Sequence, residues 1–245
     1  MLNLAPGPSE DFMQSDQKNA ALIGMLFIVA AVTAIMGYLL YDPVLGHPNY
    51  ILNGPTHASH ITWGAVFELL TASSVAGTAI TLYPRLRQHG PRRALAYVAF
   101  RWLEAVLIVV GLMCMLTILT LRQQWEAGNF TDASGLQAVE RALVALHDWT
   151  FVLGPNFMLG INTLMYSTVL FQAKLVPRPL GALGVFAALS VFCASVLEIF
   201  GVIAQVSASG AVLALPVAVF EISLAVYLLR HGWRVPPTAS TPSTP

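Results

Sequence analysis

Long apolar stretches alternate with short polar segments along the whole chain. Six of these stretches are long enough to cross a membrane, since the bilayer core of about 30 Å takes roughly 20 helical residues. They cover residues 20–41, 60–82, 96–120, 147–171, 180–204 and 211–229. The pattern predicts an all-α fold, an integral membrane bundle of six transmembrane helices.

The composition agrees with a protein that is dissolved mostly in lipid. Of the 245 residues, 56% are hydrophobic and 10% are charged, and the formal net charge is zero. The chain has no basic stripe, so we predict no nucleic-acid partner. The spans leave no room for a soluble domain. We expect a polar N-terminal segment over residues 1–19, a transmembrane domain over 20–234 and a disordered tail over 235–245.

The basic residues are distributed unequally between the two sides of the predicted bundle. With loops on alternating sides, one side holds nine of the twelve: Lys18, Arg85, Arg87, Arg92, Arg93, Lys174, Arg178, Arg230 and Arg234. The other side holds Arg122 and Arg141, and Arg101 lies within a span. By the positive-inside rule the first side is cytoplasmic. We therefore expect a multi-pass protein of the cell (inner) membrane with both termini in the cytoplasm.

The segment before the fourth span predicts a helix outside the apolar stretch. Ser134 followed by Gln137 fits a capping box, and Leu136, Val139 and Leu143 follow at helical spacing. We expect this helix to begin at Ser134 and to run directly into the fourth span.

Ionisable side chains within the spans are the main candidates for function. A charge in hydrocarbon costs about 2.5–3.5 kcal/mol on insertion scales, so each one needs a partner or a role. These side chains are Glu68, Arg101, Glu104, Glu198 and Glu221. Arg101 and Glu104 are three residues apart on one helical face and can form an ion pair. One arginine cannot neutralise four carboxylates, so the others must be protonated, hydrated or paired with a cationic ligand.

Structural roles explain some of these residues equally well. Arg101 lies about 12 Å from Arg93 and has a side chain long enough to reach the cytoplasmic interface, or its pair with Glu104 only ties helices together. Glu68 and Glu221 have short side chains and lie deeper in the predicted membrane than Arg101, which favours a buried functional or helix-bridging role. Glu198 lies closer to the outer surface, where solvation explains it as well as a site does.

The fourth span is interrupted near its middle. Gly154 and Pro155 remove a backbone hydrogen bond, and Asn156 is placed to satisfy a freed carbonyl. Such interruptions line cavities in transporters, while a kinked packing helix explains the same pattern. The candidate ligand-binding residues are therefore Glu68, Arg101, Glu104, Asn156 and Glu221.

Histidines at the outer ends of two spans raise a metal hypothesis. His57 and His60 are three residues apart, and His147 with Asp148 lies at the same depth on the fourth span. These residue types suit zinc, copper or iron, and a haem held by His60 and His147 is a further alternative. The pattern is weak and histidines are common at membrane surfaces, so we assign no cofactor. His147 and Asp148 are also the candidate catalytic residues.

Four short motifs resemble a known family. They are residues 100–105 (FRWLEA), 146–148 (LHD), 174–181 (KLVPRPLG) and 220–225 (FEISLA). From about the second span onward the chain is similar to the bacterial domain-of-unknown-function 4386 family of small polytopic membrane proteins. The resemblance implies a membrane fold and no activity. The family pattern picks out Arg101, Glu104, His147, Asp148 and Glu221, and it implies no metal.

Three functions stay open. In the first, the bundle encloses a polar cavity that binds or transports a small amphipathic or cationic molecule. The distribution of carboxylates over four helices favours this alternative. Alternatively, it is a membrane-embedded enzyme that uses His147, Asp148 or a carboxylate pair on a lipid-like substrate, with or without a metal or haem. A scaffold subunit is the third. The predicted partners are the lipid bilayer and a small-molecule ligand, and a homo-oligomer is left open.

Overall fold

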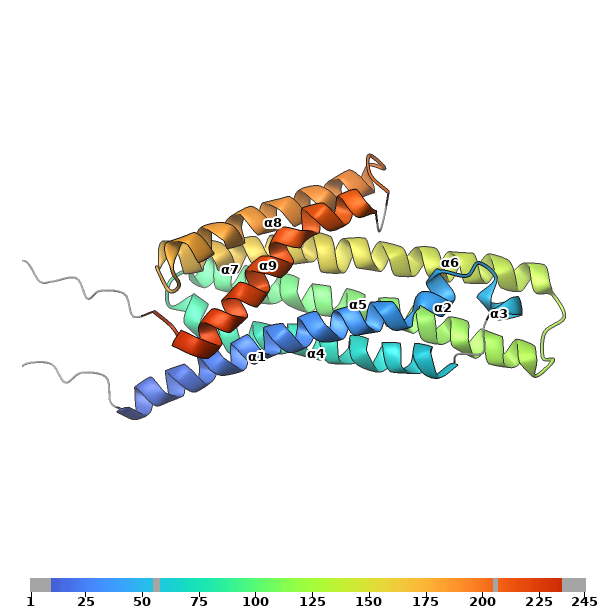
Figure 1. Ribbon diagram of the computed structural model, residues 1–245, viewed down its shortest axis with the longest axis horizontal. Helices are drawn as coiled ribbons and strands as arrows, with labels where there is room; N and C mark the ends of the chain where they lie inside the picture. Colours follow the sequence, from blue (N-terminus) through green and yellow to red (C-terminus); the bar gives the residue numbers. More distant parts are fainter. Residues whose placement is uncertain (1–9, 55–57, 205–206, 235–245) are drawn as a thin grey trace, which may run out of the picture.

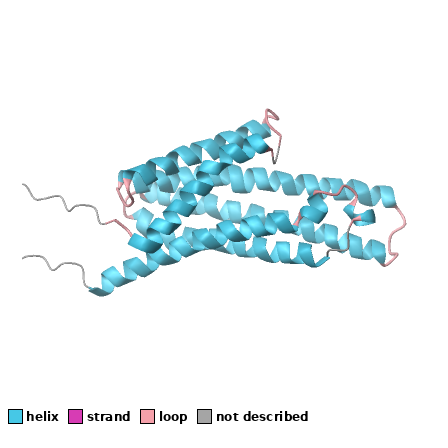
Figure 2. Ribbon diagram, viewed as in Figure 1, coloured by secondary structure: helices cyan, strands magenta, loops and turns pink. Residues whose placement is uncertain are grey.

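The computed structural model describes residues 10–54, 58–204 and 207–234. These residues form helices joined by turns, with no strand in the ranges given, so the all-α prediction is confirmed (Figures 1 and 2). The long helices are α1 (Glu10–Leu40), α4 (Ala58–Arg87), α5 (Pro91–Glu126), α6 (Ala133–Phe151), α7 (Leu159–Gln172), α8 (Arg178–Ile199) and α9 (Ala208–His231). Two short helices, α2 (Asp42–Leu45) and α3 (Tyr50–Asn53), follow α1, and the π-helix η1 (Val152–Met158) joins α6 to α7.

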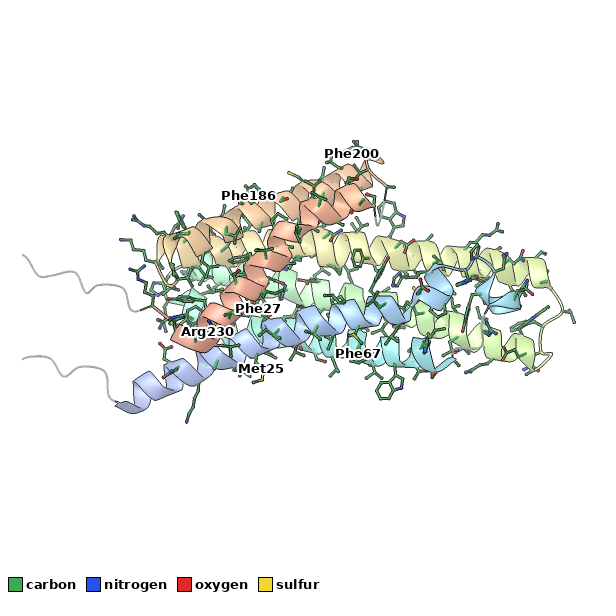
Figure 3. The ribbon with its side chains drawn as sticks, viewed as in Figure 1. Met25, Phe27, Phe67, Phe186, Phe200 and Arg230 are labelled. Atoms are coloured by element: carbon green, nitrogen blue, oxygen red, sulfur yellow. The ribbon has the colours of Figure 1, made fainter. Side chains whose placement is uncertain are left out.

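Within the described residues, five helices are long and apolar enough to cross a membrane. They are the Asp16–Leu40 part of α1 together with α4, α5, α8 and α9. Large apolar side chains project outward from them, including Met25, Phe186 and Phe200 (Figure 3). The predicted fourth span is continuous in the structure, but it is built from the end of α6, η1 and α7. A membrane bundle is therefore supported, and the sixth crossing stays a prediction.

Both ends of the described chain lie at the same end of the bundle. The start of α1 and the end of α9 lie at the left in Figure 1, together with the α4–α5 and α7–α8 turns. The nine basic residues grouped by the sequence belong to these segments. Which side of a membrane this end faces stays a prediction. α1 begins at Glu10, inside the predicted polar segment, and the predicted tail over 235–245 lies outside the described residues.

Two predicted helix ends differ from the observed ones. The fifth predicted span extends to residue 204, but α8 ends at Ile199 because the chain turns at Gly201, whose φ of +68° favours glycine. The cap of α6 is Asp132 rather than Ser134. Its Oδ1 accepts hydrogen bonds from Gly135 N at 3.0 Å and from Ser134 Oγ at 2.7 Å. The predicted continuation of this helix into the fourth span is confirmed.

A close helix crossing fixes the positions of α1 and α9. A Cβ atom on Gly24 of α1 would lie only 2.7 Å from the carbonyl oxygen of Ala225 on α9, so only glycine allows this approach. The two helices diverge toward the right of this crossing in Figure 1. Near the crossing, buried aromatic rings form much of the core, with Tyr166 in contact with Phe27, Tyr97 and Phe220.

At the opposite end of the bundle, the short helix α3 is held against α5 and α6. Glu140 of α6 is buried and accepts hydrogen bonds from Tyr50 N at 2.7 Å and Ile51 N at 3.0 Å. Arg122 of α5 donates to Tyr50 O at 2.9 Å, and its guanidinium lies 4.5 Å from the centre of the Tyr50 ring. The segment after α1 therefore closes one end of the bundle.

Candidate functional site

Arg101 of α5 lies at the centre of a buried polar cluster. Its side chain is 1% exposed, and its Nη1 lies 3.1 Å from Glu104 Oε2 and 3.7 Å from Glu221 Oε1 on α9. Its Nε donates to Thr78 Oγ1 of α4 at 3.1 Å. The predicted ion pair with Glu104 is confirmed. The alternative in which Arg101 extends to the cytoplasmic interface is wrong, because carboxylates of α5 and α9 hold it inside the bundle.

Asn162 connects this cluster to α7. Its Nδ2 donates to Glu104 Oε2 at 2.7 Å and to the Met158 carbonyl of η1 at 2.8 Å. Asn162 Oδ1 is buried and accepts no hydrogen bond from the described residues, whereas Glu221 lies beside Arg101 and the Tyr166 side chain. Buried acceptors normally have a partner, so Asn162 Oδ1 is a position at which a water or a ligand group would bind.

Glu68 of α4 lies in a second group of polar side chains, near the end of α1. Its Oε2 accepts a hydrogen bond from the Tyr41 hydroxyl at 3.2 Å. The Tyr41 ring packs edge-on against His147, with 5.8 Å between ring centres. His147 is buried, and its Nδ1 lies 3.3 Å from Oδ1 of the more exposed Asp148. The two candidate catalytic residues thus contact each other, and His147 lies near Glu68.

The two groups face one cavity of about 150 Å³, which we call the inner cavity. Its lining includes the ionisable residues Glu68, Arg101, Glu104, His147 and Glu221. Four of the five candidate ligand-binding residues are therefore brought together, from three different helices. The volume would hold a few water molecules or one small ligand group.

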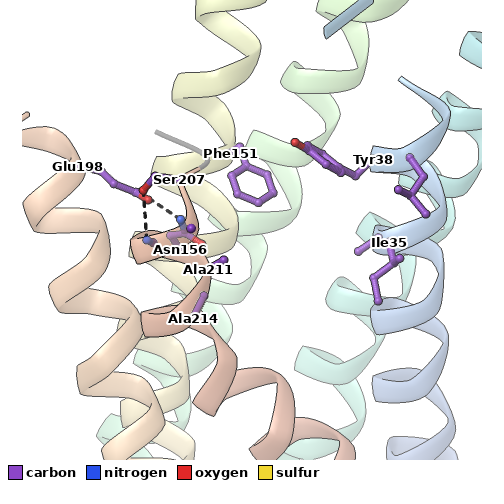
Figure 4. A pocket seen from close by; sticks show the side chains of 12 residues that line it. Ile35, Tyr38, Phe151, Asn156, Glu198, Ser207, Ala211 and Ala214 are labelled. Atoms are coloured by element: carbon purple, nitrogen blue, oxygen red, sulfur yellow. Dashed lines mark hydrogen bonds between the residues drawn. The ribbon is translucent and has the colours of Figure 1, made fainter. Parts of the chain in front are cut away.

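A larger cavity of about 490 Å³ lies between α1 and α9, and we call it the α1–α9 cleft (Figure 4). One wall comes from α1, with Ala34, Ile35, Tyr38 and Leu39. The facing wall comes from α9, with Ala208, Gly210, Ala211 and Ala214. The lining is completed by four further residues: Phe151, Asn156, Glu198 and Ser207. Three of these residues, Ala34, Tyr38 and Phe151, also line the inner cavity. The two cavities are therefore neighbours that share a wall.

The interruption in the fourth span positions Asn156. Pro155 has no backbone N–H, and the chain widens here into the π-helix η1. Asn156 Nδ2 donates to Glu198 Oε2 of α8 at 3.2 Å instead of to a backbone carbonyl. The predicted bond from Asn156 to a carbonyl freed by Pro155 is therefore wrong, because the side-chain amide binds Glu198. Glu198 has little exposed surface, and it lines the α1–α9 cleft.

The metal hypothesis receives no support from the part of the chain that the structure describes. No group of three or more His, Cys, Asp or Glu side chains in it could hold a metal ion. His60 is exposed at the start of α4, whereas His147 is buried in α6. His57 lies outside the described residues.

Some residues of the site carry no clear signal in the sequence. Tyr41, Thr78 and Asn162 each hydrogen-bond an ionisable side chain, but all three are ordinary polar residues in or beside apolar stretches. Tyr38 and Phe151, which line both cavities, have the sequence pattern of ordinary membrane-helix aromatic residues. Their position between the cavities depends on how the helices are rotated against one another, which the sequence does not show.

Comparison with known proteins gives a family and no activity. The family model described as "Domain of unknown function (DUF4386)" matches residues 22–232, which is most of the chain. This agrees with the resemblance found in the sequence motifs. No curated protein and no solved structure matches the chain.

Proposed function

Because the chain belongs to the domain-of-unknown-function family DUF4386, which assigns no activity, we propose a function from its own residues: binding or transport of a small cationic or amphipathic molecule. The inner cavity is its binding site. Glu68, Glu104 and Glu221 are the carboxylates that bind the cation, and Arg101 is their counter-ion.

The charge imbalance of the inner cavity carries this proposal. Three carboxylates line it, and Arg101 is the one permanently charged base in its described lining. Arg101 contacts Glu104 and Glu221, whereas Glu68 has a hydrogen bond from Tyr41. A buried carboxylate without a counter-charge is costly, so a cation that enters the cavity gains electrostatic energy from several groups at once.

We also propose the topology that this function needs. Six crossings, with both termini in the cytoplasm of the cell (inner) membrane, agree with the shared location of the chain ends and of the nine basic residues. The fourth crossing is α6–η1–α7. Labelling of single cysteines from outside intact cells tests this proposal: positions 89 and 174 should be protected and position 129 accessible.

One observation favours an enzyme as the second candidate. His147 lines the inner cavity, and Asp148 Oδ1 lies 3.3 Å from its Nδ1. A carboxylate in this position would orient the ring so that Nε2 acts as a general base. A lipid-like substrate would enter the same cavity. This candidate predicts a chemically altered product, whereas binding or transport predicts that the ligand is recovered unchanged.

The test is cation binding by the purified protein in lipid nanodiscs. We expect hexyltrimethylammonium to bind, as measured by calorimetry against empty nanodiscs, and Glu221→Gln to weaken binding at least about tenfold. Glu126→Gln is the matched control, because this carboxylate is half-exposed at the far end of α5. Equal binding by wild type and Glu221→Gln would contradict the proposal. Turnover of an added lipid that is lost in His147→Ala would replace it with the enzyme.

A further inference from the structure

The α1–α9 cleft lies beside the inner cavity but is different in character. Its walls are mainly apolar, from Ile35 and Leu39 of α1 to Ala211 and Ala214 of α9. At about 490 Å³ it is within the size range of pockets that bind small organic molecules, whereas the inner cavity is too small for more than a ligand's polar group. An amphipathic molecule therefore needs both cavities.

The cleft lies where two helices diverge. α1 and α9 touch at Gly24 and Ala225 and separate beyond that crossing, and the cleft lies in the separated part (Figures 1 and 4). Ile35 and Leu39 are each about 60% exposed on this part of α1. In a membrane these side chains face lipid, so an apolar molecule dissolved in the bilayer can reach the cleft from the side.

Two aromatic rings form the boundary between the cavities. Tyr38 and Phe151 line both cavities, and their ring centres are 6.3 Å apart. Aromatic faces attract cations, most strongly where water is excluded, so this pair favours a cationic group over a neutral or anionic one. Beyond the pair lie the carboxylates of Glu68 and Glu221.

A carboxylate also lies at the cleft itself. Glu198 lines it and is held by Asn156, as Figure 4 shows. An approaching cation therefore meets a negative group in the cleft before it reaches the inner cavity. A phosphate-bearing lipid headgroup would be repelled by the same groups.

We propose that the α1–α9 cleft is the entrance from the bilayer and the binding site for the apolar part of a hydrophobic ammonium ion. The ammonium group passes the Tyr38–Phe151 pair, whose contacting rings must move apart to admit it, and binds at Glu68 and Glu221. This inference rests on the proposed function and adds to it the route and the ligand class, an amine or quaternary ammonium ion that carries an alkyl or aryl group.

The test fills the cleft and compares two cations that differ only in their apolar part. Ala211→Trp places an indole in the cleft, and Val212→Trp is the matched control, because Val212 is the next residue on α9 and is 68% exposed. We expect Ala211→Trp to weaken hexyltrimethylammonium binding at least about tenfold, with Val212→Trp within about twofold of wild type. Tetramethylammonium, which has no tail, should bind to all three proteins with equal affinity at equilibrium, because a narrower entrance slows entry and exit alike and leaves the inner cavity unchanged.

The outcomes separate this inference from the proposed function. Unchanged hexyltrimethylammonium affinity in Ala211→Trp, while Glu221→Gln still weakens it at least about tenfold, overturns the role of the cleft and leaves the inner cavity as the site. Loss of tetramethylammonium binding in Ala211→Trp shows a general structural defect, and Ala211→Leu then replaces it as the test, with a smaller loss expected for hexyltrimethylammonium alone. If wild type binds neither cation, the proposed function itself is wrong.

Discussion

Arg101 Nη1 and Glu221 Oε1 lie 3.7 Å apart, on helices α5 and α9 that are far apart in the sequence. Arg101 also donates a hydrogen bond to Thr78 of α4 and contacts Glu104. Because Glu104 accepts a hydrogen bond from Asn162 of α7, one guanidinium connects four helices inside the apolar bundle. The arrangement is asymmetric, since one arginine is paired with two glutamates. Removing Arg101 should therefore lower the free energy of unfolding much more than removing either glutamate.

We expect Arg101→Ala to destabilise the protein strongly. The substitution leaves Glu104 and Glu221 buried without a cation, and breaking a buried pair in this way costs about 3–5 kcal/mol. Denaturant or thermal unfolding in mild detergent measures the loss. Adding Glu104→Gln and Glu221→Gln to Arg101→Ala should recover part of the stability. Arg141→Ala, on an exposed position of α6, is the control and should change little.

Glu140 is expected to hold α3 in place. Glu140→Ala removes the acceptor of two backbone N–H groups, at Tyr50 and Ile51, and each buried donor left unpaired costs about 1–3 kcal/mol. Amide hydrogen exchange over residues 50–53 should become faster, while exchange in α8 and α9 should be unchanged. Uniform acceleration over the whole bundle would show that Glu140 has a global role instead of this local one.

The membrane-spanning stretches could be predicted from the sequence because lipid exposure is a property of local composition. Each helix that faces lipid must be apolar over a fixed length, and this requirement is visible without knowing any neighbour. The same holds for Arg101 and Glu104, whose contact follows from the period of one helix. A continuous helical stretch over residues 147–171 could also be predicted, but its π-helical part could not, because the Gly154–Pro155 pair fits a simple kink as well.

Contacts between helices could not be predicted because they depend on how the helices are rotated against one another. The Glu68–Tyr41 and Asn156–Glu198 hydrogen bonds join segments whose relative rotation is set by packing at places such as Gly24. The cap of α6 was missed for a local reason. Asp132 and Ser134 are both good cap residues only two positions apart, and the sequence alone favoured the wrong one.

Acid should loosen the first turn of α6. Hydrogen bonds from the Gly135 amide and the Ser134 side chain lower the pKa of Asp132 below its ordinary value of 3.8. A carboxylate with a lowered pKa in the folded state stabilises the turn at neutral pH, and this contribution is lost as pH falls below 3.8 and through the folded-state pKa. The exchange rate of the Gly135 amide, corrected for intrinsic pH dependence, should rise over that range.

The control for this effect is Asp132→Asn, which keeps a cap but carries no charge. In this variant the protection of the Gly135 amide should not change between neutral and acidic pH. If wild type and Asp132→Asn respond to acid in the same way, a different group is responsible.

Pro155→Ala should separate stability from ligand binding. Alanine restores the backbone donor that proline lacks, so the segment can return toward a regular α-helix, and we expect thermal stability to be equal or higher. A regular helix rotates Asn156 away from Glu198 and narrows the α1–α9 cleft, so hexyltrimethylammonium affinity should fall. Pro84→Ala, at the proline inside α4 and away from both cavities, is the matched control and should leave affinity unchanged. Equal affinity in wild type and Pro155→Ala would show that the π-helix is only a packing feature.

Glu68 can be tested as a ligand-binding residue by comparison with its own partner. Tyr41→Phe removes the hydrogen bond to Glu68 Oε2 but keeps the ring against His147, so it should cost about 1 kcal/mol of stability and change cation affinity by less than about threefold. Glu68→Gln keeps a hydrogen-bond acceptor for Tyr41 but removes the charge, so stability should be retained while cation affinity falls about tenfold. Calorimetric binding and thermal unfolding of the two variants measure both quantities. If Glu68→Gln loses stability and keeps affinity, Glu68 is a structural partner of Tyr41, and Glu104 and Glu221 alone bind the cation.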